Sequence, residues 1–127
     1  MLLKWLGEQG EAALLMAAIA VSVPFDLGGC AARLEIGWSR IYQYRLLESM
    51  KTTVRSKAHL LHNHIDVARL LKTGTFCTFD NLGTALIHGF QDADDYYTRA
   101  SCRPFLRTIH TPVLILQATD DPLMRPR

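Results

Sequence analysis

The amino-acid sequence predicts an α/β fold in which two parallel strands are joined through a long helical insertion. Residues 14–23 and 112–118 form continuous apolar runs, a pattern that favours strands covered on both faces, as in parallel sheets. Between them, residues 27–93 carry apolar side chains at helical spacing. Because parallel strands need a crossover connection, we expect residues 14–23 and 113–117 to lie side by side in one sheet.

Length and composition indicate one small globular domain. The chain has 127 residues, of which 49% are hydrophobic and 20% charged. Fourteen basic and twelve acidic residues nearly balance, so we expect no nucleic-acid partner. The apolar stretch 12–21 is too short for a membrane span, which takes roughly 20 residues. Glu8 and Glu11 precede it at the place where a secretory signal is positively charged, so the stretch predicts a buried strand. Three cysteines without a CxxC spacing predict reduced thiols in a cytoplasmic protein.

The insertion carries two apolar stripes, each of which predicts one face of an amphipathic helix. The stripes are Trp38, Ile41, Tyr42, Leu46 and Met50, and Leu61, Ile65, Ala68 and Leu71. They fit a helical cap over an active site, and they fit two ordinary amphipathic helices equally well. The pair Gly28-Gly29 matches neither phosphate-loop pattern and predicts a turn into the insertion.

Helices are also predicted near both ends of the chain. Residues 1–8 have the pattern of a helix that ends at a glycine, Gly7 or Gly10. A second helical segment extends to about Ile109, and the acidic residues before it suit an N-cap and the positive end of a helix dipole. These acidic residues are Asp92, Asp94 and Asp95. The chain therefore divides into a first helix and strand (1–26), a helical cap (27–93), and a last helix, strand and acidic loop (94–127).

The serines and histidines do not form a catalytic motif within the sequence. A nucleophilic serine at a strand–helix turn needs G-x-S-x-G, and the nearest match, Ser39, lacks the second glycine and a preceding strand. His59, His62 and His64 do not share one helical face and have no acidic or cysteine partner, so they predict solvated residues and no metal site. No metal or organic cofactor is expected.

Two aspartates directly follow the second predicted strand. Asp120 and Asp121 come after the apolar run 112–118, and open α/β sheets place ligands and catalytic groups past the carboxyl ends of their strands. A turn in which an aspartate accepts local hydrogen bonds produces the same pattern. The residue pattern leaves both interpretations open.

Several short strings of residues, taken together with their order and spacing, are characteristic of a known fold. Residues 1–8 read MLLKWLGE, residues 20–27 read AVSVPFDL, and residues 112–116 with 118–122 read PVLIL and ATDDP. His88-Gly89-Phe90, the acidic run from Asp92 to Tyr97, and Arg103-Pro104-Phe105 lie between them. Together they resemble the second half of an α/β-hydrolase, most closely the YheT-type hydrolases. Residues 1–8 correspond to the helix after the nucleophile elbow and residues 20–27 to the next core strand. The strings between residues 88 and 105 correspond to the segment after the cap, and residues 112–122 to the strand and loop of the catalytic acid.

The resemblance implies a partial α/β-hydrolase fold and a serine esterase or lipase acting on small carboxylic esters. It places the catalytic acid at Asp121, with Asp120 as the second choice, and assigns residues 27–93 to a cap that shapes the substrate pocket. It also implies that the nucleophilic serine lies a few residues before Met1 and the histidine well beyond Arg127. The chain is then expected to be a truncated piece that does not catalyse by itself.

A non-enzymatic helical interaction module is the alternative function. The amphipathic span 27–93, with more basic than acidic residues, supports it. The two strand-like apolar runs favour the hydrolase, because a helical module does not need them.

Overall fold

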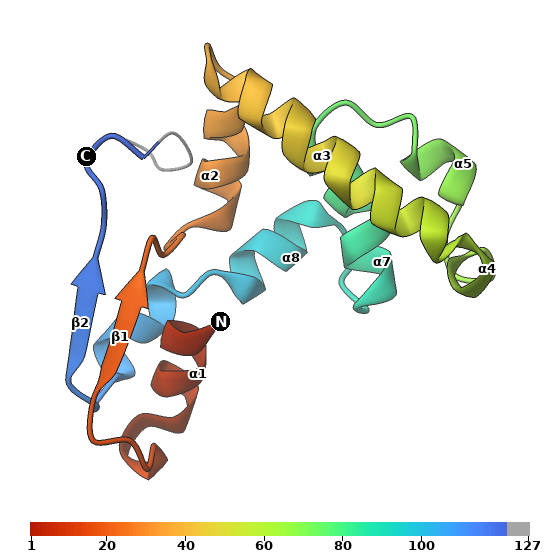
Figure 1. Cartoon of the computed structure of the whole chain (residues 1–127). Coiled ribbons are helices and arrows are strands. Elements are labelled where there is room, and N and C mark those ends of the chain that lie inside the picture. The colour runs from red at the N-terminus through yellow and green to blue at the C-terminus, as the bar shows by residue number, and fades with distance from the viewer. Residues whose placement is uncertain (122–127) are drawn as a thin grey trace.

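The computed structural model describes residues 1–121 and confirms the predicted parallel pair of strands (Figure 1). Pro122, at the end of the predicted acidic loop, lies with residues 123–127 outside the described residues. The elements in chain order are α1 (Leu2–Gln9), η1 (Gly10–Ala12), β1 (Ala18–Val21), α2 (Leu27–Leu34), α3 (Ser39–Ser56), α4 (Ala58–Leu61), α5 (Val67–Leu70), α6 (Phe76–Phe79), η2 (Asp80–Thr84), α7 (Ala85–Ile87), α8 (Ala93–Ala100), η3 (Arg103–Thr108) and β2 (Val113–Leu116).

Strands β1 and β2 pair in parallel, with Ala18 opposite Val113 and Val21 opposite Leu116. Each strand has four residues, so both are shorter than the apolar runs that predicted them. In the first run, Leu14 and Met16 lie before the strand and are almost fully exposed. Pairing rather than hydrophobicity sets the strand ends, because a residue belongs to a strand only where its backbone bonds to the neighbouring strand.

Within the described residues, the sheet is covered on one face only. Leu3 and Leu6 of α1 pack with Ala20 and Cys102 into one core cluster, and side chains of η3 and β2 close it. On the opposite face, Ile19 is 61% exposed. The prediction that both strands are covered on both faces is therefore wrong for this part of the chain, since α1 and η3 lie against the same face.

Helix α1 ends at glycine, as predicted, and packs very closely on η3. Gly10 closes the helix with φ 54°, a left-handed backbone that favours glycine. Gly7, inside α1, allows the close approach: a Cβ atom there would lie 2.4 Å from the carbonyl oxygen of Phe105. The Thr108 hydroxyl donates to the Gly7 carbonyl at 2.7 Å and fastens the two elements together.

Helix α3 buries a different face from the one that its apolar stripe predicted. Gln43, Leu47 and Lys51 are buried, whereas Trp38 just before the helix is 84% exposed and Tyr42 is 52% exposed. Polar side chains can line this buried face because they are bonded there. The Gln43 side chain accepts from the backbone N–H of Phe76 at 3.2 Å, and Lys51 donates to Glu48 at 3.0 Å.

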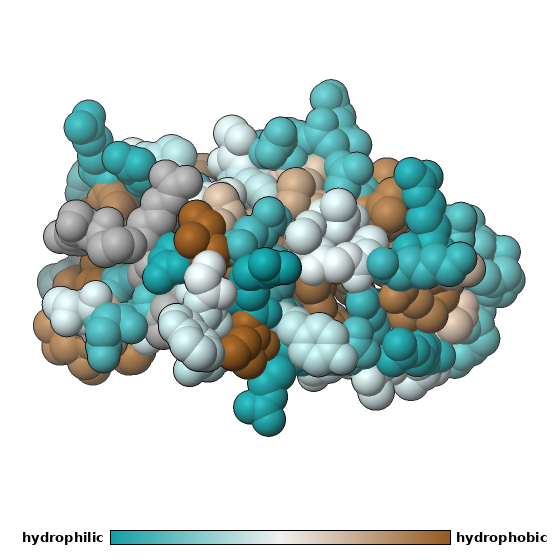
Figure 2. Space-filling model, turned by 90° about the horizontal axis from the view of Figure 1, so that it is seen from above, coloured by the Kyte–Doolittle hydropathy of each residue, from teal (hydrophilic) through white to brown (hydrophobic). Residues whose placement is uncertain are grey.

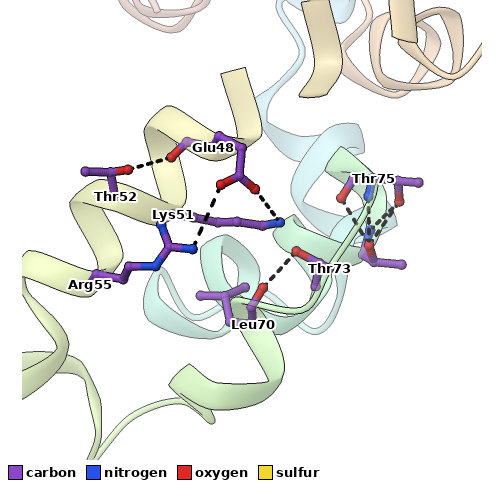
Figure 3. A network of polar contacts seen from close by, with 8 residues as sticks. Glu48, Lys51, Thr52, Arg55, Leu70, Thr73 and Thr75 are labelled. Atoms are coloured by element: carbon purple, nitrogen blue, oxygen red, sulfur yellow. Dashed lines mark hydrogen bonds and ion pairs between the residues drawn. The ribbon is translucent and has the colours of Figure 1, made fainter. Parts of the chain in front are cut away.

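Figure 3 shows polar contacts within α3 and, next to them, within the segment that contains Leu70, Thr73 and Thr75. Glu48 lies between Lys51 and Arg55, at 3.0 and 3.9 Å, and the Thr73 hydroxyl donates to the Leu70 carbonyl at 2.8 Å. Beneath this layer, the insertion has its own apolar cluster. Its buried members are Leu47, Ile65, Leu70 and Phe79.

From above, Figure 2 shows hydrophobic residues as separate spots among hydrophilic ones.

The second predicted stripe does not lie on one helix. Residues 61–71 are divided between α4 and α5, and Ala68 is exposed. The break has a local cause: the Asp66 side chain accepts from the N–H of Arg69 at 2.9 Å and caps a new helix. Ile65 and Leu70 still reach the apolar cluster from the two sides of this break.

Asp92 is an N-cap, as predicted. Its side chain accepts from the N–H of Asp95 at 2.8 Å at the start of α8. The helix is shorter than expected and stops at Ala100, because Ser101 adopts an extended backbone, and a 3₁₀ segment that begins with Arg103-Pro104 follows. Gly28 and Gly29 were predicted to form a turn and lie instead in the first turn of α2, where the Asp26 side chain accepts from Gly29 N–H.

Candidate functional site

The carboxyl ends of β1 and β2 meet at one edge of the sheet, which we call the carboxyl edge (Figure 1). The Ser22 N–H donates to the Leu116 carbonyl at 2.9 Å, one residue beyond β1. The Gln117 side-chain amide then donates to the Val23 carbonyl at 3.4 Å. Both exits are thus joined at the place where α/β sheets carry their ligands and catalytic groups.

Ser22 has an unusual backbone at this edge. Its φ is 51°, and among the described residues it is the one non-glycine with a positive φ. Such a conformation costs roughly 1–2 kcal/mol for an ordinary residue. It turns the chain away from β2 directly after the last backbone bond between the two exits. No sequence pattern predicts this conformation, because serine has no particular preference for the left-handed region.

The predicted acids follow β2 toward the end of the molecule where α2 lies (Figure 1). Asp120 is exposed and Asp121 is partly buried. Val21 and Leu116 are paired at the ends of the two strands. Asp26 comes five residues after Val21, and Asp121 comes five residues after Leu116. The two strand exits therefore each lead to a carboxylate at the same distance along the chain.

A hollow of about 330 Å³ lies beside the exit from β1. Asp26 and Gly28 line one side of it, and Asp94, Thr98 and Arg103 of α8 and η3 line the other. Backbone bonds hold this region together, since Arg103 N–H donates to the Phe25 carbonyl at 3.1 Å. Charged and hydroxyl side chains are thus available next to the carboxyl edge.

Ser101 joins the start of α2 to the end of α8. Its hydroxyl accepts from the N–H of Leu27 at 3.0 Å and donates to the carbonyl of Tyr97 at 2.6 Å. Leu27 is the first residue of α2, and Ser101 directly follows α8. The segment from α2 to α8 therefore leaves the sheet and returns to it at the same point.

A buried polar network that no sequence pattern predicted lies between α8 and η2. Asp80 accepts hydrogen bonds from the hydroxyls of Tyr97, at 2.7 Å, and Thr84, at 2.6 Å. Burial, and secondly the bond to Asp80, raise the pKa of the Tyr97 hydroxyl far above its ordinary value. Asp80 lies in a π-helical turn, and no pattern in the sequence marks it as a partner of Tyr97.

Ser39 and the three histidines considered for a metal site lie apart from the carboxyl edge. Ser39 is buried at the start of α3, within the insertion. His59, His62 and His64 are exposed around α4. His110 precedes β2 and so lies toward the opposite edge of the sheet from Asp121.

Residues 1–121 contain no group of three potential metal-binding side chains. Of the three cysteines, Cys102 is buried, Cys30 is partly buried and Cys77 is exposed. In the same part of the chain, no helix combines the length and apolarity needed to cross a bilayer.

Comparison with known proteins gives relatives that match almost the whole chain. It is 40% identical over 121 residues to the putative esterase YheT of Escherichia coli K12, a match that covers 94% of this chain and 36% of that protein. It is 35% identical over 123 residues to the phospholipase ABHD3 of Mus musculus, covering 95% of this chain and 30% of the relative. For the monoacylglycerol lipase of Saccharomyces cerevisiae the identity is 34% over 128 residues, covering 94% and 28%.

The chain belongs to the α/β-hydrolase family, as these similarities show. The parallel pair of strands agrees with this class. Within that family it is YheT-like. It spans about a third of the length of the curated relatives it matches. No family model and no solved structure matches the chain.

Proposed function

We propose that this chain forms part of a cytoplasmic serine hydrolase that cleaves carboxylic esters, with Asp121 as the acid of its catalytic triad. The carboxyl edge carries the proposal: an acidic loop follows β2 beside the exit from β1, in a chain similar to an esterase, a phospholipase and a monoacylglycerol lipase. In this role, Asp121 accepts a hydrogen bond from an imidazole, keeps it in the required tautomer and stabilises the imidazolium that forms.

The serine and the histidine come, in this proposal, from segments outside the given sequence. The sequence contains no G-x-S-x-G, and it matches only about a third of each relative's length. By itself the chain is then inactive, because loss of triad members costs on the order of 10⁴- to 10⁶-fold in rate. Residues 27–93 act as the cap that shapes the substrate pocket, and the ester is a small molecule.

The test uses the longer protein, here called the complete protein, obtained by translating the DNA on both sides of this reading frame. We expect a G-x-S-x-G elbow within about ten residues before Met1 and a histidine one helix-and-strand unit after Arg127. The complete protein should hydrolyse p-nitrophenyl esters with short acyl chains. The change Asp121→Asn should lower turnover by roughly 10⁴-fold, because the imidazole then adopts the wrong tautomer.

The matched control is Asp120→Asn, which should have a much smaller effect on turnover. Ester hydrolysis that survives Asp121→Asn would show that another residue is the acid. The absence of an elbow in every reading frame would remove the hydrolase proposal. The helical interaction module would then be the better function, and the exposed Trp38 and Tyr42 would be the first residues to test for binding.

A further inference from the structure

We propose that Gln117 is a positioning residue that holds the loop bearing Asp121 in place by binding the exit of β1. This inference rests on the proposed function, because it concerns the placement of the proposed acid. Gln117 directly follows β2 and lies four residues before Asp121. Its side-chain amide donates to the Val23 carbonyl, which lies in the exit of β1.

The backbone ladder between the two strands ends at Leu116. The Ser22 N–H donates to Leu116, and the left-handed conformation of Ser22 then directs the chain away from β2. Pro24, two residues later, has no N–H to offer. Past Leu116, the side chain of Gln117 therefore replaces the backbone ladder as the connection between the two exits.

The backbone of Ser22 also places the acceptor. Its positive φ is sparsely populated and persists only where the surrounding structure determines it, and such residues cluster at functional sites. Here the turn presents the carbonyl of the next residue, Val23, toward Gln117. The strained turn and the side-chain amide thus act together, one presenting the acceptor and the other donating to it.

This bond is expected to contribute little to the stability of the fold. Gln117 is exposed, and a 3.4 Å separation is long for an N–H···O bond. Catalysis is more sensitive than stability, because a misplacement of about 1 Å at a reacting group can cost on the order of 10²-fold in rate. Loss of the Gln117 amide should therefore alter turnover much more than the unfolding temperature.

The experiment compares Gln117→Leu with Gln91→Leu in the complete protein. Gln91 is also exposed but precedes α8, away from the carboxyl edge, so it is a matched control. We expect Gln117→Leu to lower kcat by about 10- to 100-fold with KM nearly unchanged, and Gln91→Leu to change neither. Because the imidazolium loses part of its carboxylate partner, the acid limb of the kcat/KM profile should move to lower pH.

Two further measurements separate positioning from a general structural effect. In an Asp121→Asn background, Gln117→Leu should cause no additional loss, since a residue that acts through Asp121 has nothing left to place. Amide hydrogen exchange over residues 118–121 should become faster in Gln117→Leu and not in Gln91→Leu.

The outcomes distinguish this inference from the proposed function. If Asp121→Asn slows turnover but Gln117→Leu does not, or if the two losses multiply, the positioning role is wrong and the acid assignment stands. If Asp121→Asn leaves turnover intact, the acid assignment fails and the positioning role fails with it. Unchanged hydrogen exchange over residues 118–121 in Gln117→Leu would also overturn the inference.

Discussion

The Tyr97 hydroxyl donates a 2.7 Å hydrogen bond to Oδ2 of Asp80, and both side chains are buried. This bond joins α8, which leads back to the sheet, to η2 inside the helical insertion. The second carboxylate oxygen of Asp80 accepts from Thr84. Buried carboxylates are costly unless hydrogen-bonded, so the two hydroxyls make this placement of Asp80 tolerable.

Removal of the Tyr97 hydroxyl should destabilise the fold. We expect Tyr97→Phe to lower the free energy of unfolding by about 1–3 kcal/mol, because the buried Asp80 carboxylate then loses one of the two hydroxyl groups that donate to it. Chemical denaturation of the complete protein measures the change. Tyr44→Phe is the control, since Tyr44 is 67% exposed, and it should change stability by less than about 0.5 kcal/mol. Equal effects of the two changes would contradict the structural role of the Asp80 bond.

Alkaline pH should weaken the same contact. Burial and the bond to Asp80 raise the pKa of Tyr97 above the ordinary value of about 10. Because the folded-state pKa is the higher one, the stability that Tyr97 contributes is complete below about pH 10 and is lost as the pH rises beyond it. Tyrosinate absorbance should show one tyrosine that ionises only on unfolding, and Tyr97→Phe should remove that step. A titration in which every tyrosine ionises before unfolding would refute this assignment.

The contact between α1 and η3 should not tolerate a side chain at Gly7. A methyl group there meets the Phe105 carbonyl oxygen at 2.4 Å, so Gly7→Ala should cost about 1–3 kcal/mol despite the better helix propensity of alanine. Gly74→Ala is the matched control, because nothing lies within 4 Å of a Cβ atom at that position. The control should leave stability unchanged or raise it by up to about 1 kcal/mol. Denaturation midpoints of the two variants decide the matter, and a neutral Gly7→Ala would mean that α1 does not pack this closely.

The chain studied alone should self-associate. Ile19 and Val21 point away from the covered face of the sheet, and their strand partners Leu114 and Leu116 are also about half exposed. An exposed apolar sheet face with unpaired strand edges favours association. Analytical ultracentrifugation at micromolar concentration should show oligomers or precipitate, and Ile19→Thr with Leu114→Thr should reduce them. A cooperative, soluble monomer of the unmodified chain would contradict this expectation.

Features encoded locally were predictable from the sequence. The parallel pair followed from two apolar runs separated by helix, and the Asp92 cap from acidic residues ahead of a helical segment. The strand lengths and the buried face of α3 were not predictable, because both depend on which partner is present. The stripe through Trp38 and Tyr42 has helical spacing, but the neighbouring segment contacts Gln43 and Leu47 instead.

The features of the candidate site differ in the same way. Asp120 and Asp121 were located as candidates because the residues before them predicted a strand, and their catalytic roles remain a prediction. Asp80 and Tyr97 lie 17 positions apart, and only the fold brings them together. The conformation of Ser22 and the reach of Gln117 to Val23 likewise depend on the pairing of two distant segments.

The Ser101 hydroxyl has a consequence for how such chains can diversify. It accepts from the N–H of Leu27, the first residue of α2, and Ser101 directly follows α8, so the helices from α2 to α8 begin and end at a single anchor. A module with coincident ends can be lengthened, shortened or exchanged without shifting the strands on either side of it. Selection can thus remodel the helices between α2 and α8 as an interchangeable unit while the spacing between the exits of β1 and β2 stays constant.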